Sequence, residues 1–247
     1  LHNYWIKQNN IKATYDKKLI NEENIENLIF QIKKGEITGV NVTVPFKKTV
    51  IPFIEKLTPE ANESYSVNTI YMKDKKIIGH NTDIAGFELG IRHIKYNIKD
   101  KKVFILGAGG VVSSIILGLK KMGVSKIIIS NRTIQKAKDL KKNYSNLEII
   151  EWGEIPKFDM IINATSVGLR KNDEIKLNYK DIEPNKFFYD VIYNPKETHF
   201  LKKAKEFGHR NENGKMMFIY QAHQAFTIWN NVMPKIDEEV INLLEND

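Results

Sequence analysis

The segment Val103-Phe104-Ile105-Leu106-Gly107-Ala108-Gly109-Gly110 carries the strongest fold signal in the chain. A continuous apolar run such as residues 103–106 is typical of a strand that is buried on both faces of a parallel sheet. The glycine-rich turn comes next, and residues 111–122 then have the apolar spacing of a helix. The segment therefore predicts a strand, a tight turn and a helix, which is the repeating unit of an α/β protein.

Strands and helices continue to alternate after this unit. A second strand at 127–129 precedes a helix at 134–144, and further strands are predicted at 159–164 and 187–191. Alternation with short loops favours a Rossmann-like, doubly wound parallel sheet.

The pattern before residue 103 is different. Apolar residues at helical spacing occupy 21–34, and Gly35 then ends that helix. Residues 40–44 alternate as a strand, which Pro45 ends. The remaining elements predicted here are short strands at 67–71 and 76–79 and a helix at 84–96.

After Gly214 the pattern is helical to the end of the chain, and we expect these helices to return and pack on the N-terminal part. The predicted fold class is α/β, with an N-terminal α/β domain that the C-terminal helices complete. The predicted boundaries are 1–83 with 216–247 for this domain, and 84–215 for the Rossmann-like domain.

Length and composition support a globular protein of two unequal domains. The chain has 247 residues, of which 42% are hydrophobic, and no stretch approaches the roughly 20 apolar residues that cross a bilayer. It contains no cysteine, which excludes disulfides, thiolate metal sites and a thiol nucleophile. A reducing compartment suits this composition, so a cytoplasmic location is expected.

The net charge of +8 raises the question of nucleic-acid binding. Lysines are spread along the whole chain and alternate with Glu and Asp, so they do not form a basic patch. A nucleic-acid binder remains an alternative, and it would bind with a steep dependence on salt. The six histidines have no metal-ligand spacing, and no metal is expected.

The glycine-rich turn is a candidate dinucleotide site. Gly107 and Gly109 stand at the first two glycine positions of the fingerprint, and their lack of a side chain lets the backbone approach a pyrophosphate. The following helix would offer free N–H groups and a partial positive charge. Val112 stands where a third Gly or Ala is usual, so the fingerprint is imperfect.

The end of the second strand favours NADP over NAD. NAD-binding proteins usually place an acidic residue there, to hold the ribose 2′-hydroxyl. This chain has Ser130-Asn131-Arg132-Thr133, with Lys136 one turn later. The guanidinium of Arg132 can bind a 2′-phosphate. The alternative is that Asn131 and Thr133 only cap the next helix.

Two further segments suggest a catalytic pair. Asn41-Val-Thr-Val-Pro-Phe-Lys47 places a lysine shortly after a strand, and Asn81-Thr-Asp83 places an acid before a helix. A carboxylate beside a lysine can orient its protons for transfer. The alternative is that Asp83 is a helix N-cap and Lys47 a solvated loop residue.

Taken together, these segments resemble the shikimate dehydrogenase family, whose members reduce 3-dehydroshikimate with NADPH. The resemblance extends through nearly the whole chain and rests on motifs in a fixed order. These are Asn41–Lys47, Val67-Asn68-Thr69, Asn81–Asp83, Gly107–Gly110, Asn131-Arg132-Thr133, Asn163-Ala164-Thr165-Ser166-Val167-Gly168, Asp190–Tyr193, Gly214, and Gln221-Ala222 with Phe226 and Trp229.

The resemblance implies roles for individual residues. Lys47 and Asp83 would be the catalytic pair. Residues that would bind the substrate, 3-dehydroshikimate or shikimate, are Thr43, Asn68, Asp83, Tyr193 and Gln221. Residues that would bind NADP are Gly107, Ala108, Gly109, Gly110, Val111, Asn131, Arg132, Thr133 and Lys136, with Val191 and Gly214 at the nicotinamide end.

The family pattern is not complete. Its members normally begin with a strand and a loop whose two serines bind the substrate carboxylate, and Leu1 falls just after that position. We therefore expect that this chain lacks a short N-terminal piece. His80 and Met216 also differ from the commonest family residues.

Several alternatives remain open within the resemblance. The chain could be a quinate/shikimate dehydrogenase with broader cofactor use, or a non-catalytic NADP-binding module. The resemblance implies a small-molecule substrate, with no nucleic-acid or membrane partner, and either a monomer or a homodimer.

Overall fold

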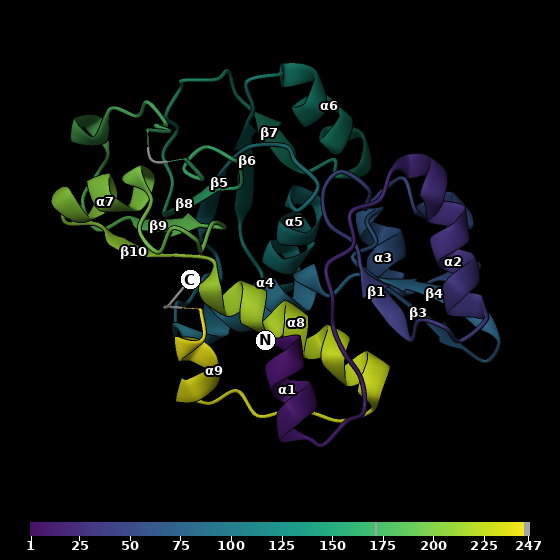
Figure 1. Cartoon of the computed structure of the whole chain (residues 1–247). Helices are drawn as coiled ribbons and strands as arrows, with labels where there is room; N and C mark the ends of the chain where they lie inside the picture. The colour runs from purple at the N-terminus through teal and green to yellow at the C-terminus, as the bar shows by residue number, and fades with distance from the viewer. Residues whose placement is uncertain (171, 245–247) are drawn as a thin grey trace.

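The computed structural model describes residues 1–170 and 172–244. Lys171 and residues 245–247, the last three of the domain predicted over 1–83 and 216–247, lie outside the described residues. The chain forms a small mixed sheet in its first part and a larger parallel sheet in its second, as Figure 1 shows. The predicted α/β class is confirmed. No helix in the described ranges is long and apolar enough to cross a membrane.

The elements follow one another along the chain in two groups. The first group is α1 (His2–Gln8), η1 (Glu22–Asn24), α2 (Ile25–Lys33), β1 (Gly39–Asn41), η2 (Ile51–Phe53), β2 (Lys56–Leu57), α3 (Pro59–Ser64), β3 (Thr69–Lys73), β4 (Lys76–His80) and α4 (Asp83–His93). The second is β5 (Lys102–Leu106), α5 (Val112–Lys121), β6 (Lys126–Ser130), α6 (Ile134–Asn143), β7 (Leu147–Ile149), β8 (Met160–Asn163), η3 (Tyr179–Asp181), β9 (Phe187–Asp190), α7 (His199–Glu206), β10 (Arg210–Glu212), α8 (Lys215–Asn230) and α9 (Glu238–Asn242).

The larger sheet is doubly wound. Its strand order is β10-β9-β8-β5-β6-β7, and every neighbouring pair is parallel. The chain enters at β5, moves outward to β7 and returns to β8 on the other side of β5. In such sheets ligands bind beyond the carboxyl ends of the strands, where the two directions separate. Gly107 follows β5 at that point.

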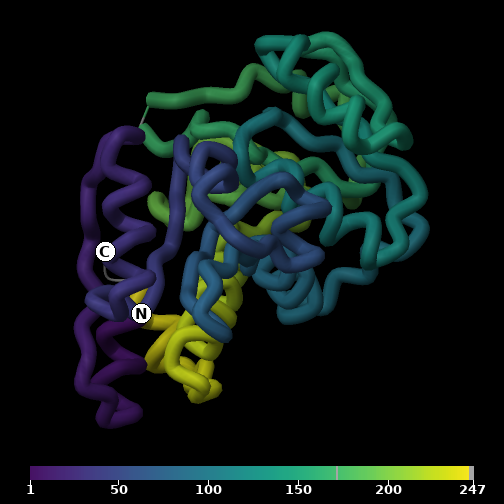
Figure 2. The backbone as a smooth tube through the Cα atoms, turned by 90° about the vertical axis from the view of Figure 1, so that its right-hand side faces the viewer, coloured from purple at the N-terminus to yellow at the C-terminus, as the bar shows by residue number. Residues whose placement is uncertain are grey.

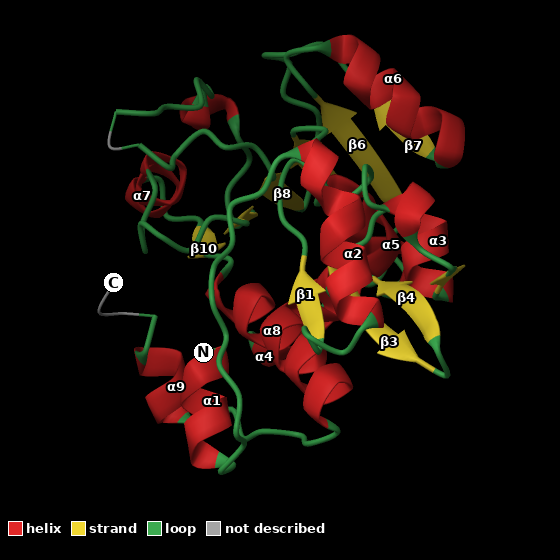
Figure 3. Ribbon diagram, turned by 45° about the vertical axis from the view of Figure 1, so that its right-hand side comes forward, coloured by secondary structure: helices red, strands yellow, loops and turns green. Residues whose placement is uncertain are grey.

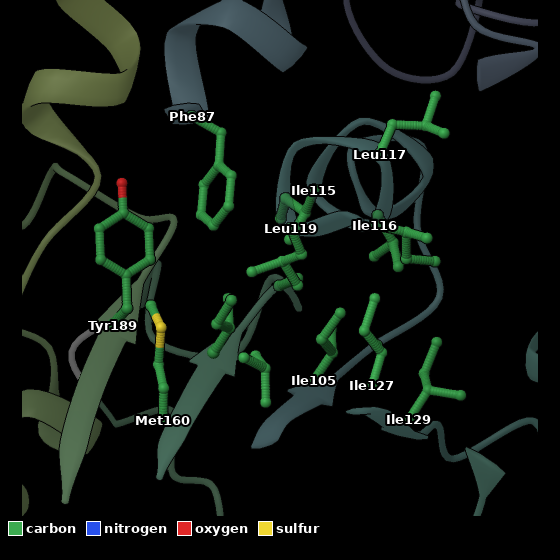
Figure 4. Packing of buried hydrophobic residues seen from close by; sticks show 14 of the residues in the cluster. Phe87, Ile105, Ile115, Ile116, Leu117, Leu119, Ile127, Ile129, Met160 and Tyr189 are labelled. Carbon is green, nitrogen blue, oxygen red and sulfur yellow. The ribbon is translucent and has the colours of Figure 1, made fainter. Parts of the chain in front are cut away.

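Side chains of the larger sheet alternate between two apolar cores. On one face Ile105 packs in a cluster with Ile115 of α5 and Phe87 of α4, as Figure 4 shows. On the other face Phe104 packs in a cluster with Phe200 of α7. Burial on both faces explains why the strands of this sheet are continuous apolar runs.

The small sheet has the strand order β1-β3-β4-β2. β3 and β4 form an antiparallel hairpin, whose turn residues Asp74 and Lys75 have φ of 51° and 60°. Positive φ at both positions is typical of the tight turn that suits the twist of a hairpin. Ile70 and Ile77 of the hairpin belong to one core with Ile25 of α2.

The C-terminal helices return to the N-terminal part, as the helical pattern after Gly214 predicts. Trp229 of α8 donates from Nε1 to the Ile70 carbonyl of β3 at 3.3 Å. Trp5 of α1, Phe226 of α8 and Val240 of α9 share an apolar cluster, and Figures 1 and 3 show α1 and α9 side by side. Figure 2 shows the purple N-terminal segment on one side of the molecule and the teal segments of the larger sheet on the other.

Two glycines of α4 allow α8 to approach closely. A Cβ on Gly86 would lie 2.8 Å from the Met217 carbonyl oxygen and 2.8 Å from Gln221 Cβ. A Cβ on Gly90 would lie 3.1 Å from the Met217 nitrogen. Since Gly86 is one turn from Asp83, this packing brings Gln221 towards the start of α4.

The structure also corrects parts of the predicted pattern. The helix predicted from Gly214 to the end is interrupted, because Asn231 ends α8 in the left-handed region (φ 51°) and α9 starts only at Glu238. The strand predicted at 40–44 is shorter, since β1 ends at Asn41. The sequence pattern does not predict α1, α3, α7, β2, β7 and β10, which are short or lack clear periodicity.

We predict that Gly86→Ala destabilises the chain by about 1–3 kcal/mol, because the added methyl must displace the α8 backbone. The higher helix propensity of alanine recovers only up to about 1 kcal/mol. Urea unfolding measures the change. Gly90→Ala is the matched control on the same helix, and it should cost less because its nearest contact is longer. A Gly86→Ala chain as stable as the native one would contradict this view of the α4–α8 packing.

Candidate active site

The structure brings Lys47 and Asp83 together. Lys47 Nζ lies 2.6 Å from Asp83 Oδ2, and the two side chains are only 13% and 8% exposed. Asp83 Oδ1 accepts a hydrogen bond from Asn68 Nδ2 at 2.8 Å. Buried ion pairs need further hydrogen bonds to offset the loss of hydration. Here each carboxylate oxygen has its own donor.

The β3–β4 hairpin and its neighbours position this pair. Val67 donates from its backbone N–H to the Lys47 carbonyl at 2.8 Å, which fixes the turn that carries the lysine. Asn68 precedes β3, and its Oδ1 accepts from the Thr82 backbone N–H at 2.8 Å. Asp83 is the first residue of α4, and its backbone N–H donates to Asn81 Oδ1 at 3.0 Å.

A polar network extends from the pair towards the surface. Asn41 donates from Nδ2 to the Asn68 carbonyl and to Thr69 Oγ1, each at 3.2 Å. Asn41 Oδ1 accepts from the Tyr15 hydroxyl at 2.9 Å. Tyr15, Asn41 and Thr43 line a groove of about 620 Å³. Thr43 is exposed there, and the groove lies beside the Lys47–Asp83 pair without including it.

Two other predicted substrate residues meet at α8. The ring of Tyr193 stacks on Phe218, with centroids 4.4 Å apart and planes at 21°. Gln221 donates from Nε2 to the Phe218 carbonyl at 3.1 Å. Both side chains are half-buried, and they come from segments that the sequence separates by 28 positions.

The glycine-rich turn lies against the catalytic candidates. Gly107 has φ of 111°, and a Cβ there would come within 2.7 Å of the Ala164 carbonyl oxygen. Only glycine suits this position. The nearest atom to a Cβ on Gly110 would be Lys47 Cδ, at 4.0 Å. A nucleotide held by this turn would therefore lie close to the lysine.

The predicted 2′-phosphate site is an exposed basic edge. Arg132 and Lys136 are exposed after β6, and within residues 1–170 and 172–244 neither forms an ion pair. Asn131 donates from Nδ2 to the Thr133 carbonyl at 2.7 Å, and the Thr133 side chain makes no capping bond. A capping side chain accepts from a backbone N–H, so these contacts are not those of a helix cap.

The predicted nicotinamide end contains two backbone segments in contact. A Cβ on Gly214 would collide with the Val191 carbonyl oxygen, and the Gly214 N–H donates to the Ile192 carbonyl at 3.2 Å. A larger residue at 214 would separate the start of α8 from the loop after β9.

A buried carboxylate holds the loops at this end of the sheet. Asp190, at the end of β9, accepts from Asn163 Nδ2 at 3.1 Å, from the Ile192 N–H at 3.0 Å and from Thr198 Oγ1 at 2.6 Å. Burial raises the pKa of Asp190 to about 6, although these hydrogen bonds favour its charged form. The carboxylate thus links the ends of β8 and β9 to the start of α7.

Several residues of this site are not assigned by the sequence analysis. Asn41, Thr69, Asn81 and Thr82 join the network around Lys47 and Asp83, and Asp190 anchors the neighbouring loops. The signal that could have found Asp190 is a charged residue at the end of an apolar strand of a parallel sheet. The network residues stand in motifs that carry the family resemblance, but no local chemical pattern marks their roles.

Comparison with known proteins identifies the family. Residues 1–70 match the profile described as "Shikimate dehydrogenase substrate binding domain", and residues 88–197 match "Shikimate / quinate 5-dehydrogenase". The chain belongs to the shikimate dehydrogenase family. The family resemblance in the sequence is thereby confirmed.

Individual relatives cover nearly the whole chain. A protein of Pelagibacter ubique named shikimate dehydrogenase (NADP(+)) is 60% identical over 99% of this chain and 92% of its own length. The crystal structure of shikimate dehydrogenase from Aquifex aeolicus is 35% identical, with a TM-score of 0.89 over 99% of this chain and 91% of that one. A shikimate dehydrogenase solved in complex with NADP+ is 32% identical, also with a TM-score of 0.89, over 99% and 87%.

We predict a pH-dependent effect of Asp190→Asn on stability. Because the pKa of Asp190 is raised in the folded chain, that chain binds more protons than the unfolded one between pH 3.8 and about 6. The favourable contribution of Asp190 is thus present at low pH and lost as the pH rises to about 6. The unfolding free energy of the native chain, relative to the variant, should fall by on the order of 3 kcal/mol over this range. Urea unfolding of both chains at several pH values measures this change. A difference in unfolding free energy that does not vary with pH would contradict the raised pKa of Asp190.

Proposed function

We propose that this chain catalyses the reversible, NADPH-dependent reduction of 3-dehydroshikimate to shikimate, a step in aromatic amino-acid biosynthesis. The observation that carries the proposal is the buried Lys47–Asp83 pair beside the glycine-rich turn. The family match supports the substrate class, and the name of the Pelagibacter ubique relative supports NADP.

The cofactor fits the residues present. Gly109 and Gly110 leave room for a pyrophosphate, and the N-terminus of α5 begins at this turn, where a helix favours an anion. Arg132 and Lys136 offer two exposed cations for a 2′-phosphate. When bound, NADPH supplies the hydride that reaches the ketone carbon. The other proposed contacts are Ala108, Gly109, Val111, Asn131 and Thr133, with Val191 and Gly214 at the nicotinamide.

The chain itself supplies the proton. As hydride reaches the carbonyl carbon, negative charge develops on the carbonyl oxygen, and Lys47 Nζ donates a proton to it, which yields the alcohol. Asp83 keeps the Lys47 ammonium oriented through its 2.6 Å contact. In the reverse direction Lys47 accepts the hydroxyl proton.

The remaining substrate contacts are assigned from their positions around this pair. Asn68 is buried beside Asp83 and donates to it, and the family resemblance assigns it to a substrate hydroxyl. Gln221 and Tyr193 approach from the α8 side, and Thr43 approaches from the groove.

The proposed function requires a substrate-binding unit and an NADP-binding unit. We assign residues 1–83 and 216–247 to a substrate-binding unit and residues 84–215 to an NADP-binding unit. The packing of α8 against β3 supports the return of the chain to the first unit. The enzyme would work in the cytoplasm, as a monomer or a homodimer.

The direct test is the oxidation of NADPH, followed at 340 nm with 3-dehydroshikimate. It should be run on this chain and on one that carries the two-serine segment of the family ahead of Leu1. Turnover in either supports the proposal. NADPH binding without turnover in both would favour a non-catalytic binding module, and faster turnover with NADH and quinate would favour the broader dehydrogenase.

We predict that Lys47→Met lowers kcat by about 10²- to 10⁴-fold, the usual effect of removing a general acid. KM for 3-dehydroshikimate should change much less, because the aliphatic stem is kept. Lys48→Met is the matched control, since Lys48 is the adjacent and exposed lysine of the same turn. Steady-state kinetics give kcat and KM for both variants. Near-normal kcat in Lys47→Met would remove Lys47 from the mechanism.

We predict that Arg132→Ala weakens NADPH binding by about 10- to 100-fold, the value of one charge-assisted hydrogen bond to a phosphate. NADH lacks the 2′-phosphate, so its binding should not change. Kd values for both cofactors, from fluorescence titration, measure the effect. Lys141→Ala controls for a general loss of positive charge, because Lys141 is exposed near the other end of α6. Equal weakening of both cofactors would contradict the 2′-phosphate assignment.

A further inference from the structure

Helix α5 begins directly at the glycine-rich turn. Val111 is its N-cap, and Ser114 is the third residue of its first turn. This turn carries the free N–H groups that an anion would contact. The Ser114 side chain is completely buried and points away from solvent, towards the segment that precedes α4.

Ser114 forms a buried contact with Asn81. Asn81 Nδ2 lies 3.0 Å from Ser114 Oγ, and Asn81 Oδ1 lies 3.3 Å from the same oxygen. Asn81 is 1% exposed, so these bonds are shielded from bulk solvent. Hydrogen bonds in such surroundings have a fixed geometry, because an unmade one is costly.

Asn81 in turn bonds to the backbone of Asp83 and to the segment that holds the Lys47 turn. Its Oδ1 accepts from the Asp83 N–H at 3.0 Å. Its Nδ2 also contacts Ser64 Oγ at 2.9 Å and the Ser66 carbonyl at 3.0 Å. Ser66 precedes Val67, whose N–H holds the Lys47 carbonyl. A single side chain thus connects the first turn of α5 to the backbone around both members of the pair.

We propose that Asn81 and Ser114 are positioning residues that couple occupancy of the cofactor site to the placement of Asp83. The inference rests on the proposed function. Pyrophosphate binding would fix the first turn of α5, and Ser114 would pass that constraint through Asn81 to the first N–H of α4. Asp83 then keeps the orientation that holds Lys47 for proton transfer.

The apolar contact between α4 and α5 cannot provide this coupling alone. A Cβ on Gly118 would lie 2.9 Å from Phe87 Cδ1, so the two helices pack closely one turn further along. That contact sets the separation of the helices but not the direction of a polar group. The Asn81–Ser114 contact, by comparison, continues through Asn81 Oδ1 to the backbone N–H of Asp83.

Coupling between two sites is reciprocal, and its usual size is about 5- to 150-fold in affinity. The test therefore measures the Kd of NADPH by fluorescence with and without saturating shikimate. These two reduced ligands cannot react with each other. In the native chain, shikimate should change the Kd of NADPH by about fivefold or more.

In Ser114→Ala, shikimate should change the Kd of NADPH by no more than about twofold. The Kd of NADPH without shikimate should stay within about twofold of the native value. Asn81 keeps its bonds to Ser64, Ser66 and Asp83 in this variant, so the chain should fold, as urea unfolding can check. Ser113→Ala is the matched control, because Ser113 is the adjacent buried serine and has no bond to Asn81 within the described residues. It should keep the native coupling.

Three results would overturn the inference: no coupling in the native chain, full coupling in Ser114→Ala, or an equal loss in Ser113→Ala. The proposed function is judged separately. If the native chain does not turn over 3-dehydroshikimate but the coupling behaves as expected, the catalytic assignment fails and the coupling stands. If turnover is normal and Ser114→Ala keeps its coupling, only the inference fails.

Discussion

The ion pair of Lys47 and Asp83 is the interaction on which the rest of the site depends. Two charges removed from water need each other and further hydrogen bonds to be stable. Asn68 meets this need at one carboxylate oxygen, and Asn81 and Val67 hold the backbone on either side. The hairpin of β3 and β4 presents these groups in one place. A polar cluster of this kind is costly to bury, and it lies beside the glycine-rich turn.

Close backbone approach is the second constraint. Gly86 lets α8 pack on α4, Gly107 lets the turn after β5 pass the Ala164 carbonyl, and Gly214 lets α8 begin against Val191. The Gly86 contact joins α4 to α8, whereas the Gly107 and Gly214 contacts join loops that follow strands of the larger sheet. Asn81 and Ser114 add a buried polar contact between the segment before α4 and the first turn of α5.

Much of the larger sheet could be predicted from the sequence. Its strands are buried on both faces, so they appear as apolar runs such as 103–106, and the glycines mark the turn that follows. The small sheet was less predictable, since β2 has only two residues and owes its place to pairing with β4. The break between α8 and α9 escaped the pattern, because apolar residues continue through the bend at Asn231 to pack on Trp5 and its neighbours.

The sequence by itself determined which chemical groups are available: a lysine, an acid, a glycine-rich turn and two cations after the second strand of the larger sheet, in the order of one family. It could do so because each of these signals is local and lies within a few residues of the end of its own strand. Only the tertiary structure decided that Lys47 lies 2.6 Å from Asp83, that Gln221 and Tyr193 meet at Phe218, and that Asp190 is buried among three donors. The Lys47–Asp83, Tyr193–Phe218 and Asn163–Asp190 contacts join residues far apart in the chain, and packing, which no local pattern records, brings them together.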